Sequence, residues 1–192
     1  LAALHRLDPD TVGLGDLGRR EAYLARQLAR WKTQWEKTKT RELPEMDEAH
    51  AALTARMPEQ QTAAIVHGDY RIGNLLVDGT AGRVRAVLDW ELCTLGDPLA
   101  DLGYLLNDWY DPGDPPPEPG GTGLPPTFCG GFPRREALLA RYEAITGLST
   151  AKIAYYRAFQ YWRLAAIVEG VLARYLKGVM GEGGNVEAFR RQ

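Results

Sequence analysis

Residues 65–78 read IVHGDYRIGNLLVD, and this stretch sets a polar segment between two short apolar runs. Short apolar runs rich in β-branched residues, here beginning with Ala63–Val66, predict strands, so we expect the polar segment to be a loop between two strands. Asp69 and Asn74 stand five residues apart on this loop. Polar side chains on a loop held by a rigid scaffold are candidates for binding or catalysis.

A third apolar run follows, and we expect it to pair with the second run as a hairpin. Val84–Leu88 is joined to Leu75–Val77 by the turn sequence DGTAG at residues 78–82. Asp89 comes directly after the third run. A hairpin from Asn74 to Asp89 would bring these two side chains together at one end of the loop region.

The remainder of the chain carries helical signals. Asp97 is expected to cap a helix, with Pro98 at its first position. Residues 111–133 are rich in Pro and Gly and are expected to form an irregular surface loop. Four apolar residues recur at spacings of four, three and four, which predicts one apolar stripe of an amphipathic helix: Leu24, Leu28, Trp31, Trp35. Helices are expected at residues 1–7, 18–38, 44–57, 98–110, 134–145 and 150–176, with a further one beginning at 185–192.

Helices therefore come first, three short strands follow, and helices close the chain. This order predicts a helix-rich α+β fold.

Length and composition exclude several classes of protein. The chain has 192 residues, 45% of them hydrophobic, which suffices for one well-buried domain or one lobe of a larger protein. A formal net charge of −2 provides no basic field for nucleic acid. No apolar run approaches roughly 20 residues, the length that spans a bilayer, so no membrane partner is expected. Cys93 and Cys129 form no metal-type or redox pair, which favours a reducing cytoplasm.

The start of the chain, LAALHRLDPD, has no initiator Met and lacks the basic start and apolar stretch of a signal peptide. It is typical of the last turns of a helix already under way. We therefore expect the 192 residues to be a fragment of a longer protein.

The spacing of Asp69, Asn74 and Asp89 fits the needs of phosphoryl transfer from a nucleotide. That reaction needs a carboxylate beside the attacking hydroxyl, and Mg²⁺ ions that bridge the phosphates. Carboxylate and amide oxygens are the ligands that Mg²⁺ prefers. Protein kinases place an Asp five residues before an Asn on one loop, and a metal-binding Asp follows later. Taken singly, each of the three residues also fits a plain role as a loop, turn or strand-end residue.

The wider pattern is more specific. The chain resembles the C-terminal lobe of the aminoglycoside phosphotransferase-like kinases, which are relatives of the protein kinases. The resemblance rests on four runs in one order: HGD at 67–69, NLLV at 74–77, VLDW at 87–90 and GDPLADL at 96–102. The segments HGDYRIGN, LAALHRLD and YYRAFQYWRLAAI look like the subgroup related to phosphotransferase domains fused to acyl-CoA dehydrogenases. The resemblance covers essentially the whole chain and implies the mostly helical C-terminal lobe of a protein-kinase-like fold, with short strands carrying the catalytic loop.

This resemblance implies roles for five residues. Asp69 resembles the catalytic base that orients the substrate hydroxyl. Asn74 and Asp89 resemble the Mg²⁺ ligands. Leu76 and Leu88 would lie under the adenine of ATP (or GTP) as an apolar floor.

Other positions look like supports of the site. His67 and Asp101 resemble residues that hold the catalytic loop, and His67 is expected to hydrogen-bond locally rather than to transfer protons. Trp90-Glu91 stands where protein kinases have Phe-Gly. A protein-kinase-style activation switch is therefore not expected.

Two parts of a nucleotide kinase are missing from the sequence. Such an enzyme needs a Gly-rich turn over the phosphates and a Lys paired with a helix Glu, and neither occurs in a suitable place. The Gly-rich residues 120–123 and 181–184 are expected to be loops. We expect the N-terminal nucleotide lobe to precede Leu1. Residues 1–192 would then be the C-terminal, substrate lobe, and inactive alone.

The sequence thus predicts a small-molecule O-phosphotransferase that moves the γ-phosphoryl group of ATP or GTP to a substrate hydroxyl with Mg²⁺. The acceptor is expected to be a hydroxyacyl-CoA-like molecule, which the subgroup favours, or an amino-alcohol or aminoglycoside. The alternative is a non-catalytic module of kinase-like fold that binds a ligand or partner. The expected protein partner is the N-terminal lobe of the same protein.

Overall fold

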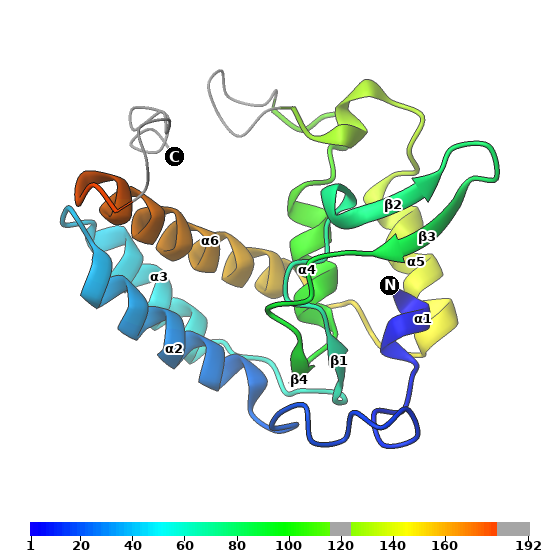
Figure 1. Cartoon of the computed structure of the whole chain (residues 1–192), viewed down its shortest axis with the longest axis horizontal. Helices are drawn as coiled ribbons and strands as arrows, with labels where there is room; N and C mark the ends of the chain where they lie inside the picture. The colour runs from blue at the N-terminus through cyan, green and yellow to red at the C-terminus, as the bar shows by residue number, and fades with distance from the viewer. Residues whose placement is uncertain (116–123, 180–192) are drawn as a thin grey trace.

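The computed structural model describes residues 1–115 and 124–179, which form helices around four short strands (Figure 1). The strands make two antiparallel pairs: β1 (Ala64–Val66) with β4 (Thr94–Gly96), and β2 (Leu75–Asp78) with β3 (Arg83–Val87). The expected helix-rich α+β fold is confirmed, and so is the hairpin of β2 and β3.

The strand β4 was not expected from the sequence. The sequence predicts a helix from residue 98 and no strand directly before it. β4 forms because it pairs with β1, with Ile65 opposite Leu95 and Val66 opposite Thr94. A strand of three residues is too short to show a periodic pattern, so only this pairing between distant segments of the chain reveals it.

The helices fall into two groups with α4 between them. Figure 1 shows α2, α3 and α6 running beside one another, while α1 and α5 lie together at the opposite side and α4 lies between. Among the residues described, no helix combines the length and apolarity needed to cross a membrane. The helices are α1 (Ala2–His5), α2 (Tyr23–Thr38), α3 (Pro44–Ala55), α4 (Leu99–Asn107), α5 (Arg135–Thr146) and α6 (Ile153–Leu176).

The core lies where α6 packs against α2, α3 and α4. Four apolar side chains of α6 keep 1% or less of their surface exposed: Tyr156, Phe159, Ala166, Leu172. On α2, Leu28 and Trp35 are buried in the same core, whereas Trp31 is only partly buried at its edge. The apolar stripe of α2 is therefore core packing except at Trp31.

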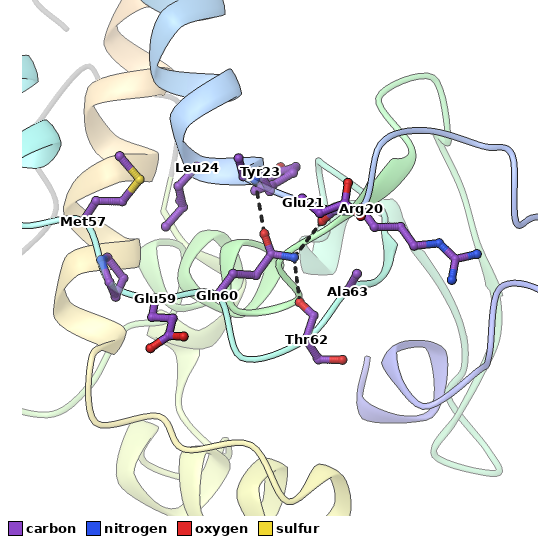
Figure 2. A pocket seen from close by; sticks show the side chains of 11 residues that line it. Arg20, Glu21, Tyr23, Leu24, Met57, Glu59, Gln60, Thr62 and Ala63 are labelled. Atoms are coloured by element: carbon purple, nitrogen blue, oxygen red, sulfur yellow. Dashed lines mark hydrogen bonds between the residues drawn. The ribbon is translucent and has the colours of Figure 1, made fainter.

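The helix α2 begins at Tyr23 and not at residue 18 as expected. Ala22 adopts a left-handed conformation with φ of 50°, which interrupts the helix at that point. The first amide of the helix is satisfied from outside, because Gln60 Oε1 accepts a hydrogen bond from Tyr23 N at 3.2 Å. Gln60 Nε2 donates to the carbonyls of Arg20 and Thr62, so one side chain joins both segments (Figure 2). A cap supplied from a distant segment leaves no signal in the local sequence.

The start of α4 is close to the expected one. Asp97 Oδ1 accepts a hydrogen bond from Leu99 N at 3.0 Å, so Asp97 satisfies a free amide at the helix start as expected. The helix itself begins one residue later than expected, at Leu99, with Pro98 at the N-cap, and it ends at Asn107 and not near residue 110.

Within the loop expected at 111–133, the described part contains a short 3₁₀ turn, η2 (Pro126–Cys129). The Gly-rich residues 120–123 and 181–184 and the helix expected from 185 lie outside the described residues.

The helices α4 and α6 meet at a glycine. A Cβ atom added to Gly103 would lie 2.8 Å from the backbone carbonyl carbon of Tyr156 and 3.1 Å from the amide nitrogen of Arg157. Backbone atoms cannot swing aside as a flexible side chain can, so a methyl group at this position would push the two helices apart. The absence of a side chain at Gly103 therefore fixes how closely α4 lies against α6.

We expect Gly103→Ala to lower the free energy of unfolding by about 1–3 kcal/mol, the usual cost of overpacking a core. Gly170→Ala on α6 is a matched control, because its added Cβ would have Gln34 Nε2 as its nearest atom at 3.5 Å. Replacing a helical glycine at that roomier site should raise stability by about 0.5–1 kcal/mol. Urea unfolding measures the free energy of unfolding of both variants. Equal effects of the two substitutions would contradict the packing argument.

Candidate functional site

A buried carboxylate on α4 holds the loop between β1 and β2. Asp101 is fully buried, and its two oxygens accept hydrogen bonds from the backbone amides of His67 (2.7 Å) and Gly68 (2.8 Å). The expected support role of Asp101 thus corresponds to a specific geometry. Because α4 is packed into the core, the position of the HGD segment is set by the core through this one side chain.

Gly68 is required at the centre of that segment for two reasons. Its φ is 86°, in the left-handed region that side chains disfavour. A Cβ atom at this position would also lie 2.6 Å from the carbonyl oxygen of Leu92. The loop therefore turns sharply against residues 91–94 just before it reaches Asp69.

His67 is a structural residue, as expected. It is fully buried, its Nδ1 accepts a hydrogen bond from Asp69 N at 3.2 Å, and its Nε2 lies 2.9 Å from the carbonyl oxygen of Leu88. A neutral imidazole with its proton on Nε2 satisfies both contacts. The ring of Trp90 covers the imidazole at 4.7 Å between centroids. Nδ1 is thereby occupied within the loop, while Nε2 joins the loop to Leu88, the residue that follows β3.

Asp69 carries a carboxylate that two neutral donors hold in place. Asn74, at the end of the 3₁₀ turn η1 (Ile72–Asn74), donates from Nδ2 to Asp69 Oδ2 at 2.8 Å and to the Asp69 carbonyl at 2.9 Å. The hydroxyl of Tyr104 on α4 also hydrogen-bonds to Asp69. Burial and the charge of Asp69 raise the pKa of Tyr104 to about 12, so Tyr104 remains a donor at neutral pH. These contacts fix the direction of the Asp69 carboxylate, but neither donor carries a positive charge that would pair with it.

Asn74 and Asp89 both lie at the base of the hairpin. The amide of Leu88 donates to the carbonyl oxygen of Asn74 at 2.8 Å, directly beside the pair Leu75 and Val87. Asp89 follows in the next position with φ of 67°, which is uncommon for a residue with a side chain. Unusual backbone conformations of this kind cluster at functional sites. The backbone pairing brings the two residues together, while convergence of their side chains stays a prediction.

The donor set at this point suits one kind of metal. Because the Asn74 amide nitrogen is used by Asp69, the amide oxygen is the atom left to coordinate a cation. Nowhere in residues 1–115 and 124–179 do three or more His, Cys, Asp or Glu side chains gather closely enough to hold a metal ion. Mg²⁺ is commonly bound by only one or two protein oxygens, with water and phosphate oxygens completing its shell. An amide and a carboxylate therefore fit Mg²⁺ and do not fit a closed structural metal site.

Leu76 and Leu88 lie on one exposed face of the hairpin. Leu75 and Val87 are paired across the strands and pack against the core, so their neighbours in each strand point to the other face. The side chains of Leu76 and Leu88 accordingly keep 55% and 50% of their surface exposed. An apolar face of this kind is suited to a flat apolar ligand, and the role of these residues as an adenine floor stays a prediction.

The sequence analysis missed two residues of this network. Tyr104 follows Asp101 by three positions on α4, so both face the same loop, and this spacing was the available signal. His5 is buried, with Nε2 3.3 Å from Asp101 Oδ2 and Nδ1 2.7 Å from the hydroxyl of Tyr142. No local pattern marks His5, because its partners come from α4 and α5.

A hollow on the surface lies apart from these residues. It measures about 450 Å³ and is lined by residues 20–24 and by residues 57–60, 62 and 63, around the Gln60 side chain (Figure 2). None of the five expected site residues lines it. Because the Gln60 amide is fully used in hydrogen bonds to backbone groups, this hollow marks the contact between two segments and is not a candidate active site.

A mostly helical lobe with a loop carrying Asp and Asn, followed by a short hairpin ending in Asp, is the architecture of the C-terminal lobe of a kinase-like phosphotransferase. Residues 1–124 match the family described as "Phosphotransferase enzyme family". The chain belongs to this family.

Similar proteins agree with that assignment. The chain is 37% identical over 183 residues to acyl-CoA dehydrogenase family member 11 of Gallus gallus, and 35% identical over 179 residues to family member 10 of Mus musculus. Each match covers 93% of this chain but only 23% and 17% of the relatives. A crystal structure described as a candidate aminoglycoside phosphotransferase from Ralstonia eutropha superposes with a TM-score of 0.85 at 35% identity. That match covers 99% of this chain and 58% of the other.

Two buried carboxylates at the start of α4 differ in a way that can be tested. Asp101 accepts two backbone amides, whereas Asp97 accepts one amide, from Leu99, and the hydroxyl of Tyr156 at 2.7 Å. Burial raises the pKa of the Asp97 carboxyl above its usual value of 3.8, so the fold favours the protonated form.

We expect Asp97→Asn to change the free energy of unfolding at pH 7 by less than about 1 kcal/mol, or to raise it. An amide can accept from Leu99 N with its oxygen and donate to the Tyr156 hydroxyl. Asp101→Asn should cost about 1–3 kcal/mol, because its NH₂ group would face a buried backbone donor.

The pH dependence of the free energy of unfolding also distinguishes Asp97 from Asp97→Asn. Because the folded pKa is raised, Asp97 loses its favourable contribution as pH rises from 3.8 through the folded pKa. Asp97→Asn should therefore gain stability relative to the wild type across that range. Urea unfolding at several pH values measures this, and a difference that does not change with pH would show that Asp97 ionises without penalty.

Proposed function

We propose that this chain is the catalytic, acceptor-binding lobe of an enzyme that transfers the γ-phosphoryl group of ATP or GTP to the hydroxyl of a small molecule. The observation that carries the proposal is the fixed Asp69 carboxylate beside the hairpin base formed by Asn74 and Asp89. Donors from a 3₁₀ turn and from α4 hold this carboxylate in one direction, and this fixed direction supports a catalytic task.

In this proposal Asp69 is the base. Its carboxylate accepts the hydrogen bond of the acceptor hydroxyl and takes the proton as the oxygen attacks phosphorus. Asn74 and Tyr104 fix the direction of that carboxylate through neutral hydrogen bonds, so its charge is kept for the hydroxyl. Holding the reacting groups in one geometry is the main contribution that a protein makes to phosphoryl transfer.

The metal would be held by the Asn74 amide oxygen and the Asp89 carboxylate. Bound Mg²⁺ would neutralise negative charge on the transferred phosphate. The left-handed backbone at Asp89 supports this assignment, because it turns the chain sharply just after β3. The Asp89 side chain then need not follow the alternation of the strand.

The nucleotide would lie on the exposed face of the hairpin, with Leu76 and Leu88 beneath the adenine. The covering surface would come from an N-terminal nucleotide lobe, which supplies the Gly-rich turn and the Lys that residues 1–192 lack. The length of the relatives supports this arrangement, since the chain spans only about a quarter or less of them. We place the whole enzyme in the cytoplasm.

For the acceptor we favour a hydroxyacyl-CoA-like molecule over an amino-alcohol or aminoglycoside. The support is the printed names of the two relatives, which are acyl-CoA dehydrogenase family members. In those proteins a domain named for acyl-CoA chemistry stands in the same chain as a segment similar to this one.

In the natural full-length protein, we expect Asp69→Asn to keep Mg²⁺–nucleotide binding and to lower kcat by about 10²–10⁴-fold, the usual contribution of a general base. Asp89→Ala should weaken Mg²⁺–nucleotide binding as well as turnover, because a charged metal ligand is lost. Asp78→Asn, in the turn of the same hairpin and paired with Arg85, is the control and should change neither quantity. Calorimetry measures binding, and mass spectrometry of the phosphorylated product measures turnover.

Near-normal turnover by Asp69→Asn would show that another group is the base. A protein that binds no Mg²⁺–nucleotide and phosphorylates none of a panel of hydroxyl compounds would instead support the non-catalytic binding module.

A further inference from the structure

A small polar hollow lies directly behind the catalytic loop. It measures about 180 Å³ and is bounded by α2, α6, Gly68 and residues 91–94. Its polar side chains include Gln27 and Arg30 from α2 and Arg163 from α6. None of the residues assigned to the base, the metal or the adenine floor lines it.

Arg163 is a buried cation with an incomplete set of partners. Only 5% of its surface is exposed. Its Nη1 donates to Gln160 Oε1 at 2.9 Å, but its Nε is buried without any hydrogen-bond partner. Gln160 is neutral, and in the described parts of the chain no carboxylate forms an ion pair with Arg163.

A buried guanidinium without a counter-ion is costly, because burial removes the water that would otherwise solvate the charge. Two aromatic rings provide part of the compensation, since Arg163 lies 5.3 Å from the ring centroid of Trp31 and 5.8 Å from that of Tyr104. Aromatic faces offer no acceptor for the free Nε–H group. An anion in the hollow would supply both the missing acceptor and the missing charge.

The other polar groups of the hollow suit the same ligand. Arg30, which is exposed to solvent, lies 5.3 Å from the Trp31 ring, so this ring contacts two guanidinium groups. Gln27 Oε1 accepts a hydrogen bond from Trp31 Nε1, which leaves its NH₂ group as a donor. Glu91 is the acidic residue of the lining, but it is exposed, so water screens its charge far better than that of Arg163.

The hollow is linked to the base by a single side chain. Tyr104 hydrogen-bonds to Asp69 through its hydroxyl, while Arg163 lies over its ring. Gly68, next to Asp69 in sequence, also lines the hollow. The hollow therefore adjoins two of the residues that hold the proposed base in place, Gly68 and Tyr104.

We propose that this hollow, formed by Gln27, Arg30, Trp31 and Arg163, binds an acidic group of the acceptor, a carboxylate or a phosphate. The proposal rests on the phosphotransferase function proposed above and narrows its acceptor to an anionic hydroxyl compound. A polycationic acceptor is disfavoured, because it would meet two arginines beside the base.

The first test measures anion binding without any turnover. Calorimetric titration of the natural full-length protein with inorganic phosphate and with a small hydroxy-carboxylic acid should detect binding of both. Arg30→Gln should weaken binding by about tenfold or more, as expected for loss of a charge-assisted contact. Lys37→Gln, which makes the same charge change at an exposed position near the end of α2, should leave it unchanged.

Arg163→Lys adds a second, independent variant. It keeps the charge but removes Nε and the planar group that lies over both rings, so it should also weaken binding. Its melting temperature is measured alongside, and Arg30→Gln decides the test if Arg163→Lys does not fold. Equal binding by the wild type, Arg30→Gln and Lys37→Gln would mean an adventitious ion only and would overturn the proposal.

The second test separates an acceptor subsite from a site for free anions. The ratio of kcat/KM for a hydroxy-carboxylic acid to that for its primary amide should fall about tenfold or more in Arg30→Gln and should stay constant in Lys37→Gln. Phosphate binding that depends on Arg30 with no change in this ratio would identify a free-anion site and overturn the acceptor role.

Failure of the proposed function would look different. If no hydroxyl compound is phosphorylated by the wild type, the phosphotransferase proposal fails. The calorimetric comparison still tests whether the hollow binds an acidic group. Binding of the hydroxy acid that depends on Arg30 would support such a site, and binding that does not depend on Arg30 would overturn it.

Discussion

The arrangement of the whole site depends on one buried carboxylate, Asp101. It ties two consecutive backbone amides of the loop between β1 and β2 to α4, and α4 packs closely against α6 at Gly103. The loop thereby takes its position from the centre of the core and not from its own short sequence. Gly68 lets the chain turn at that anchor, and Asp69 follows immediately in a direction that Asn74 and Tyr104 then fix.

Two further features lie next to the loop between β1 and β2. The β2–β3 hairpin has an exposed apolar face, and Asn74 and Asp89 lie at its base, which is where we propose that the nucleotide and its metal bind. The hollow at Arg163 carries a buried positive charge, and we propose that an acidic group of the acceptor binds there. Asp69, the proposed base, directly follows Gly68, which lines that hollow. Because the chain belongs to the phosphotransferase enzyme family, we assign the hairpin to the phosphoryl donor and the hollow to the acceptor.

Much of this could be predicted before the structure, and the reasons for success and failure are physical. The helices were recognised because their apolar residues recur at helical spacing, and the hairpin because a turn sequence joins two apolar runs. The start of α2 was misplaced because its amide cap comes from Gln60, a distant side chain. The strand β4 was missed because three residues become a strand only by pairing with β1.

The sequence by itself determined the family, most of the helices, the β2–β3 hairpin and the identity of the loop residues, because the spacing of Asp69, Asn74 and Asp89 is a property of the chain alone. Only the tertiary structure decided what surrounds those residues. Tyr104 and His5 act through partners on other elements, and the unpaired charge of Arg163 becomes significant only once α2, α4 and α6 have excluded water from it. Burial and hydrogen-bond satisfaction are relations between distant segments, and no local pattern encodes them.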